Sequence, residues 1–222
     1  MTPGVRVMNA PQHTIVKVCG LTSLEDARTA SEAGAHWLGF IVKGESPRLI
    51  SADRAGEIAS SLPRSITVAV MVSPDPDEAL SLARLAHASR IQLHRVDSAS
   101  WPEDFPVPVS FAVPIAEDGA IIDPLPPARH LVLLDAAHDS LAGGTGRPFP
   151  WETARIVAAS RPVVIAGGLD ASNVGAAIEC IRPFGVDASS RLEASPGVKD
   201  PDKVRRFTAA VRASDERLNA GA

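Results

Sequence analysis

The chain has 222 residues, of which 45% are hydrophobic and 22% are charged, and its formal net charge is −4 at pH 7. This composition is typical of a globular protein with enough apolar material for a sizeable core. The slightly acidic balance and the scattered Lys and Arg residues argue against nucleic acid or an anionic membrane as a partner.

Targeting and disulfide signals are missing from the sequence pattern. No apolar run approaches the roughly 20 residues that span a bilayer, and residues 1–13 lack the charge and hydrophobicity pattern of a signal peptide. We interpret 1–13 as a loose extension of a single domain over 1–222. Two cysteines, Cys19 and Cys180, are too few for a disulfide framework, so we expect a cytoplasmic protein, with Cys180 in the core.

Eight short apolar runs alternate with helical patterns along the chain. We expect strands at Thr14–Val18, Trp37–Val42, Ile66–Val72, Arg90–His94, Val107–Val113, His130–Asp135, Pro162–Ala166 and Val186–Ser189. Most of these runs are apolar on both faces, which is typical of parallel strands covered by helices. The pattern predicts an α/β fold, a compact (β/α)8 TIM barrel with about 28 residues per repeat.

Helix signals follow most of the expected strands. Thr22 with Glu25 forms a capping-box pattern, and Asp200 is placed to cap the last helix. The segment from Pro114 to Pro127 contains four prolines, so we expect it to be irregular in place of the fifth helix. An open doubly wound sheet is the alternative, but the first turn, 19–22, lacks the glycine pattern of a dinucleotide site.

Two turns near the end of the chain have the composition of an anion site. The seventh and eighth expected strands stop in Gly167-Gly168 and in Ser189-Ser190, each shortly before a helical pattern. Glycine lets backbone N–H groups approach a ligand, and a helix N-terminus favours negative charge. In (β/α)8 barrels a phosphate commonly lies after these two strands. We therefore predict a phosphate site there, with Arg191 beside it.

Two residues that can move protons end other strands. Cys19 follows the first strand and Asp135 ends the sixth, so both are expected at the active face of a barrel. A thiolate can accept a proton from carbon, and a carboxylic acid in apolar surroundings can donate one. The structural alternatives are a core cysteine and an aspartate that caps a turn.

Further polar residues are candidates for substrate binding. Arg48 lies on the loop after the second strand, and Gln92 and His94 point to the same side of the fourth. Gly144 lies in a glycine-rich loop that could close over a ligand. The six histidines show no metal-binding spacing, so we expect no metal. Together these residues indicate proton transfer on a small phosphorylated molecule.

Several segments, in this order and spacing, resemble the phosphoribosylanthranilate isomerase family. They are Lys17–Thr22 followed by Glu25–Ala27, then Gly39-Phe40, Ser46–Arg48, Gln92–His94, Asp135 with Gly143–Gly146, Ala166–Leu169, and Val186-Asp187 through Ser195–Asp200, within a match from about 15 to 208. The resemblance implies a cofactor-free Amadori rearrangement of N-(5-phosphoribosyl)anthranilate in tryptophan synthesis. For the assembly we expect a monomer or a homodimer.

The resemblance assigns roles to residues of this chain. Asp135 would be the general acid, Cys19 the general base, and Arg48 would hold the anthranilate part of the substrate. Gly167, Gly168, Ser189 and Ser190 would hold the phosphate.

The chain also departs from the family pattern, which usually has glycine where Arg95 and Arg191 stand and aspartate where Pro150 stands. Two alternatives therefore stay open. One is a paralogue with the same chemistry on another aminosugar phosphate, and the other is a non-catalytic protein that binds a phosphorylated ligand.

Overall fold

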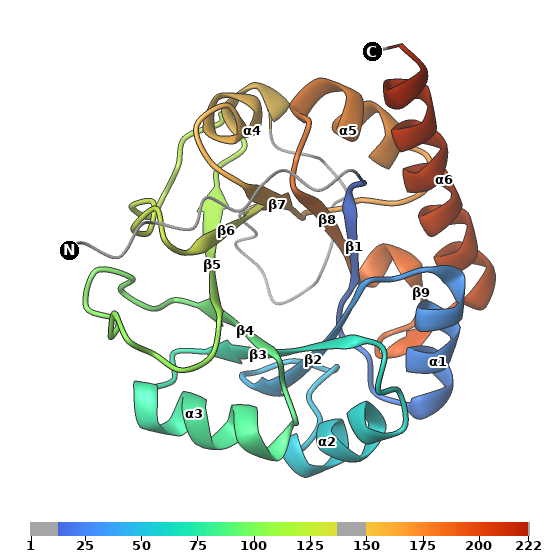
Figure 1. The fold of residues 1–222 in the computed structure, drawn as a ribbon. Coiled ribbons are helices and arrows are strands. Elements are labelled where there is room, and N and C mark those ends of the chain that lie inside the picture. Colours follow the sequence, from blue (N-terminus) through green and yellow to red (C-terminus); the bar gives the residue numbers. More distant parts are fainter. Residues whose placement is uncertain (1–12, 137–149, 222) are drawn as a thin grey trace.

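The computed structural model describes residues 13–136 and 150–221, and eight parallel strands form a closed barrel in sequence order (Figure 1). The strands are β1 (Ile15–Val18), β2 (Trp37–Lys43), β3 (Ile66–Val72), β4 (Arg90–His94), β5 (Val109–Ile115), β6 (Leu131–Ala136), β7 (Val163–Ile165) and β8 (Gly185–Ala188). The predicted parallel barrel is confirmed. The expected extension over 1–13 lies, except for its last residue, outside the described residues, as does Gly144.

Seven of the eight predicted strands differ from the observed ones by no more than one residue at either end. The largest difference is at β5, which includes Pro114 as the register partner of Asp135 on β6. Proline has no N–H, and strands tolerate it where they are paired on one side only. The pairing of β5 with β4 ends at Phe111, so Pro114 lies beyond it.

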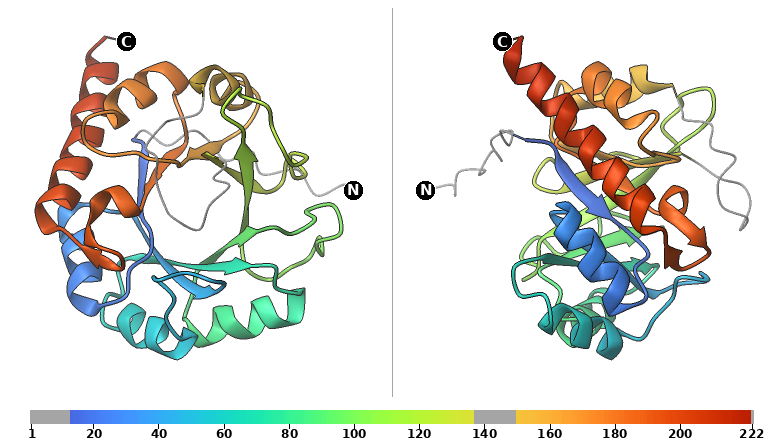
Figure 2. Two further views of the ribbon diagram at one scale, coloured as in Figure 1. Left: turned by 180° about the vertical axis from the view of Figure 1, so that it is seen from behind. Right: turned by 90° about the vertical axis from the view of Figure 1, so that its right-hand side faces the viewer.

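The helices surround the barrel, as the two further views also show (Figure 2). They are α1 (Leu24–Ala33), α2 (Ala52–Ser60), α3 (Pro76–Leu85), α4 (Trp151–Ala158), α5 (Val174–Ile181) and α6 (Pro201–Ala220). After β8 the chain forms a short 3-10 helix, η1 (Ser190–Leu192), and a hairpin of β9 (Glu193–Ser195) and β10 (Val198–Lys199) before α6 begins.

Two connections of the barrel contain no helix, and both are fully described. The sequence predicted this for 116–130, after β5, but not for 95–108, after β4. In 95–108 the buried Trp101 packs against Phe105 and Phe111, with ring centroids 5.1 and 6.1 Å apart. These aromatic side chains cover the sheet where a helix would otherwise lie.

The predicted N-cap of the first helix was wrong by one residue. Ser23, rather than Thr22, caps α1 by accepting a hydrogen bond from the Asp26 N–H at 3.1 Å. The Thr22 hydroxyl instead donates to the Gly197 carbonyl at 2.6 Å and so ties the first loop to the β9–β10 hairpin. Asp200 caps α6 as predicted, accepting from the N–H groups of residues 202 and 203.

Alternation along each strand separates two sets of buried side chains. Residues such as Val18 and Phe40 face the helices, whereas Val68, Leu133 and others pack inside the barrel. The prediction for Cys180 was wrong, because its thiol is exposed. The buried residues of α5 recur at 174, 177, 178 and 181, and position 180 lies off that stripe. In the described ranges, none of the helices combines the length and apolarity needed to cross a bilayer.

Candidate active site

A cavity of about 210 Å³ opens at the C-terminal ends of the strands. It brings together nine of the site residues predicted from the sequence: Cys19, Gln92, His94, Asp135, Gly167, Gly168, Ser189, Ser190 and Arg191. Asp187 also lines it, although the sequence analysis did not select it. Arg48 is not among the lining residues. The expected gathering of polar residues from β1, β4, β6, β7 and β8 is therefore present at one mouth of the barrel.

The turn after β7 is built for glycine. Gly167 and Gly168 have φ angles of 90° and 68°, in the left-handed region. A Cβ atom on Gly167 would lie 2.7 Å from the Cβ of Ala136, so a larger residue would collide with β6. No described residue accepts a hydrogen bond from the backbone N–H groups of Gly168 and Ser190. These two donors border the cavity and are available to an anion.

The residues after β8 hold this side of the cavity in place. The Ser189 hydroxyl donates to the Cys19 carbonyl at 3.0 Å, so it links the loops after β8 and β1. Lys199 donates from Nζ to the Ser189 carbonyl at 3.2 Å. Arg191 is exposed at the cavity rim and lies within η1, a helical conformation that any L-residue adopts without left-handed strain.

Cys19 is buried, 7% exposed, and its thiol packs against β2. Gly39 makes room for it, because a Cβ at this position would lie 2.9 Å from the Cys19 Sγ and 3.1 Å from Cε of Lys17. Burial raises the pKa of the Cys19 thiol, and the Lys17 ammonium is the strongest influence in the opposite direction. Cys19 therefore needs nearby positive charge to act as a thiolate.

Asp135 lies across the cavity, at the end of four buried residues of β6. Burial, and then the nearby Asp187 carboxylate, raise the pKa of Asp135 to about 7. A substantial fraction of Asp135 is consequently protonated at neutral pH. A carboxyl group in this state can donate a proton to a bound molecule.

The fourth strand contributes a neutral polar pair. The Gln92 amide nitrogen donates to Nε2 of His94 at 2.9 Å, an arrangement that requires an unprotonated ring nitrogen. Burial, with Lys17 and Arg95 adding to it, lowers the pKa of His94 to about 4. His94 is thus neutral at physiological pH. The next residue, Arg95, has a φ of 53°, in the left-handed region.

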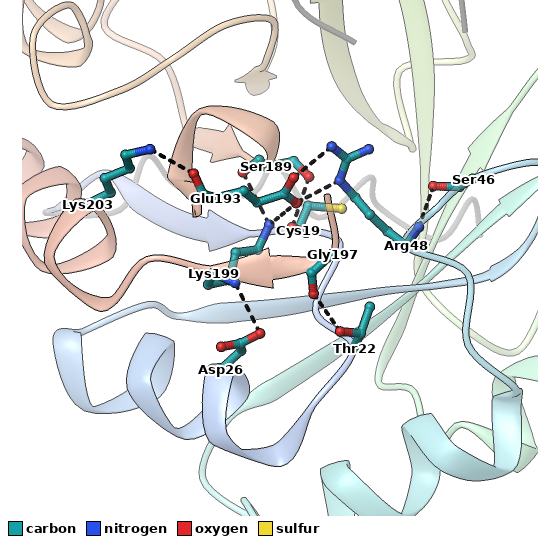
Figure 3. Close-up of polar contacts among 10 residues, drawn as sticks. All are labelled: Cys19, Thr22, Asp26, Ser46, Arg48, Ser189, Glu193, Gly197, Lys199 and Lys203. Carbon is teal, nitrogen blue, oxygen red and sulfur yellow. Dashed lines mark hydrogen bonds and ion pairs between the residues drawn. The ribbon is translucent and has the colours of Figure 1, made fainter. Parts of the chain in front are cut away.

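Arg48 is held beside this cavity by a buried charge network (Figure 3). Its Nε and Nη2 donate to the two oxygens of Glu193 at 2.7 and 2.8 Å. Lys199 donates to Glu193 Oε1 at 2.8 Å, and Lys203 to the Glu193 carbonyl at 2.7 Å. The sequence pattern predicted a binding role for Arg48 but none for Glu193 or Lys199. All three residues lie within the segments that resemble one family, and this was the feature that could have indicated a link between them. The local sequence pattern around each residue does not link it to the others.

A second ion pair escaped the sequence analysis. Lys17 Nζ lies 2.7 Å from Asp187 Oδ2 inside the barrel. In the sequence, Lys17 was selected only as part of the family match at Lys17–Thr22. The signal for the pair was the strand pattern itself, because β1 and β8 are neighbours in a closed barrel and both residues fall on inward positions. Within residues 13–136 and 150–221, no group of three or more His, Cys, Asp or Glu side chains could hold a metal ion.

Comparison with known proteins gives a family match over most of the chain. The family model for N-(5'phosphoribosyl)anthranilate (PRA) isomerase matches residues 16–210. The N-(5'-phosphoribosyl)anthranilate isomerase of Rubrobacter xylanophilus is 42% identical over 206 residues, covering 89% of this chain and 98% of that protein.

Two solved structures are also similar. One holds monomers of the dimeric phosphoribosylanthranilate isomerase from Thermotoga maritima, with a TM-score of 0.75 and 30% identity, covering 90% of this chain and 99% of that one. The other is a phosphoribosyl anthranilate isomerase in complex with reduced 1-(o-carboxyphenylamino)-1-deoxyribulose 5-phosphate. Its TM-score is 0.74 and its identity 29%, with the same coverage of both chains.

Proposed function

The chain belongs to the N-(5'-phosphoribosyl)anthranilate isomerase family, and we propose on this basis that it performs the Amadori rearrangement of that substrate in tryptophan biosynthesis. The product is 1-(2-carboxyphenylamino)-1-deoxyribulose 5-phosphate. The observation that carries the proposal is the cavity itself, in which Cys19 and Asp135 share one space with the turns after β7 and β8. The reaction moves protons and electrons within one molecule, so its chemistry calls for no redox cofactor.

We assign the acid step to Asp135 and the base step to Cys19. Asp135 protonates the furanose ring oxygen, the bond from this oxygen to C1 breaks, and a Schiff base forms at C1. The Cys19 thiolate then removes the proton from C2, which gives an enolamine that tautomerises to the ketone. The raised pKa of Asp135, about 7, supports the first assignment. A positioned acid or base typically contributes about 10²–10⁴-fold to the rate.

We assign the phosphate to the turns after β7 and β8. The N–H groups of Gly168 and Ser190 supply donors, and Gly167 lets the backbone pass close to β6. Ser189 contributes through its backbone, because its hydroxyl already donates to Cys19. Arg191 adds positive charge at the rim of this site.

We assign the anthranilate-bearing part of the substrate to the side of the cavity nearest Arg48, with Gln92 and His94 of β4 as polar contacts. The bidentate pairing with Glu193 fixes the Arg48 guanidinium in one orientation. Gly144 would complete the site from the loop after β6. A monomer or homodimer in the cytoplasm remains the expectation for this chain.

The direct test is steady-state turnover of N-(5-phosphoribosyl)anthranilate by the purified protein, together with rescue of a tryptophan auxotroph that lacks its isomerase. Turnover and rescue support the proposal. If a folded protein does neither, the paralogue with another aminosugar phosphate becomes the better assignment. If Cys19→Ala and Asp135→Asn leave every measurable activity unchanged, both enzymatic assignments are wrong.

A further inference from the structure

A buried ion pair lies directly beneath the candidate active site. Lys17 on β1 and Asp187 on β8 are register partners, and their side chains are only 1% and 7% exposed. Burying two charges costs desolvation free energy, so such a pair is weak evidence of added stability. The neighbouring positions inside the barrel are filled by apolar side chains such as Val68 and Leu133. We therefore infer that the ion pair has a role other than stabilising the fold.

The positive end of this pair is next to the proposed base. Lys17 and Cys19 are two residues apart on one strand, so their side chains point to the same side. Both also pack against the Cα of Gly39, since a Cβ there would lie within 3.1 Å of the Cys19 Sγ and the Lys17 Cε. Lys17 is the strongest influence that lowers the pKa of the thiol.

The negative end is next to the proposed acid. Asp187 lines the cavity that Asp135 also lines. One of its oxygens, Oδ2, accepts from Lys17, while Oδ1 is buried and has no hydrogen-bond partner among the described residues. After burial, Asp187 is the strongest influence that raises the pKa of Asp135, and the opposing effect of Lys17 is smaller.

The other cations near Cys19 act on the thiol but not on Asp135. Lys199 and Arg48 approach it from β10 and from the loop after β2, and both donate to the one carboxylate of Glu193. His94, which also faces Lys17, is neutral because burial lowers its pKa to about 4. The charges that act on both Cys19 and Asp135 are thus those of Lys17 and Asp187.

We propose that the Lys17–Asp187 ion pair is an oriented dipole that favours the proton on Asp135 and the thiolate on Cys19. Both residues are then positioning residues for the reaction, and this inference rests on the proposed function. The proton leaves Cys19 and arrives on Asp135, so the net charge of the site does not change. One proton shared by these two residues can be on the Cys19 thiol or on the Asp135 carboxyl. Only with the proton on Asp135 does the site hold both the acid and the base that the assigned steps need.

The test removes both charges at once with Lys17→Met/Asp187→Asn, which leaves no unpaired buried ion. Without the dipole, Asp135 loses its proton at lower pH and Cys19 at higher pH. The rising limb of the kcat/KM profile should therefore move to lower pH and the falling limb to higher pH. We expect the maximum of kcat/KM to fall about 10- to 100-fold, less than the largest losses expected from removing a base outright. If both limbs of the kcat/KM profile lie at the same pH in the double variant as in the wild type, the proposal is wrong.

A matched control separates this effect from general destabilisation. Asp215 is also a buried carboxylate and accepts from the N–H and hydroxyl of Thr14 at 2.9 and 2.6 Å, away from the cavity. Asp215→Asn should lower the thermal unfolding temperature and leave both limbs of the pH profile unmoved. If it shifts the limbs as the double variant does, the dipole is not their cause.

A second measurement needs no substrate and so tests the dipole apart from the function. In a Cys180→Ser background Cys19 is the sole thiol, and its thiolate can be followed by ultraviolet absorbance against pH. The double variant should form thiolate at higher pH than its parent, whereas Asp187→Asn alone should form it at lower pH, because Lys17 is left unpaired. Opposite shifts support the dipole even if the proposed substrate is not turned over. If the pH of thiolate formation shifts in the same direction in both variants, or in neither, the dipole proposal is wrong, even if the Cys180→Ser parent turns over the substrate.

Discussion

The two sides of the cavity that carry Cys19 and Asp135 use charge in different ways. Cys19 lies on the side built by β1, β8 and the β9–β10 hairpin, where Lys17, Lys199 and Arg48 bring positive charge close to it. Each of these cations is in turn held by a carboxylate, Asp187 or Glu193. The thiol side is therefore a fixed network of ion pairs.

The Asp135 side is built mostly from apolar residues. Asp135 follows Leu131–Leu134, all buried, on β6. Its strongest charged neighbour is Asp187, which has the same sign. Burial raises the pKa of both proposed catalytic groups, so burial alone does not distinguish a base from an acid. The sign of the strongest neighbouring charge makes that distinction.

Removing either proposed catalytic group should have the largest effect. Cys19→Ser and Asp135→Asn should each lower kcat by about 10²–10⁴-fold while KM changes little, because the loss is of proton transfer rather than of binding. Steady-state kinetics with N-(5-phosphoribosyl)anthranilate measures both constants. A large rise in KM with normal kcat would contradict the assignment for that residue.

The two pKa values together predict the pH dependence of the wild type. Productive enzyme needs thiolate at Cys19 and acid at Asp135, so the pair must carry one proton. Since the pKa of Asp135 is about 7 and burial raises that of Cys19, this state exists above pH 7 and below the thiol pKa. Below pH 7, kcat/KM should fall about tenfold per pH unit. In Asp135→Asn the residual activity should follow thiolate formation alone, so kcat/KM should keep rising through pH 7 up to the thiol pKa and should not fall above it. A wild-type profile that peaks well below pH 7 would contradict the prediction.

Glu193→Gln should disrupt the ion-pair network next to Cys19 and leave the surroundings of Asp135 unchanged. The carboxylate accepts from Arg48 and Lys199, and loss of its charge leaves two cations uncompensated beside the cavity. We expect roughly 2 kcal/mol lower stability and about a tenfold higher KM, because Arg48 is no longer fixed. Chemical denaturation and substrate titration measure these effects. Asp202→Asn, which removes an exposed ion pair with Arg205 on α6, is the control and should change neither.

The sequence pattern was sufficient for the barrel and for the strand-end residues. Each strand is a separate apolar run, so the eight could be recognised individually, and Cys19 and Asp135 each lie where such a run stops. In 95–108 the pattern failed, because Trp101 covers the sheet through tertiary packing that no helical periodicity reports. The Arg48–Glu193 pair also could not be predicted, since the partners are 145 residues apart and meet only in the closed fold.

The smallest expected effect concerns the rim of the cavity next to His94. Arg95 has a φ of 53°, where the related family usually has glycine and where a Cβ is strained. Arg95→Gly should raise the free energy of unfolding by up to about 1 kcal/mol, as measured by denaturant titration, and leave kcat/KM within about twofold. Arg95→Ala is the matched control, because it removes the charge but keeps the Cβ and should gain no stability. Equal stabilisation by both variants would show that the arginine charge, rather than its backbone conformation, is what the fold disfavours at this position.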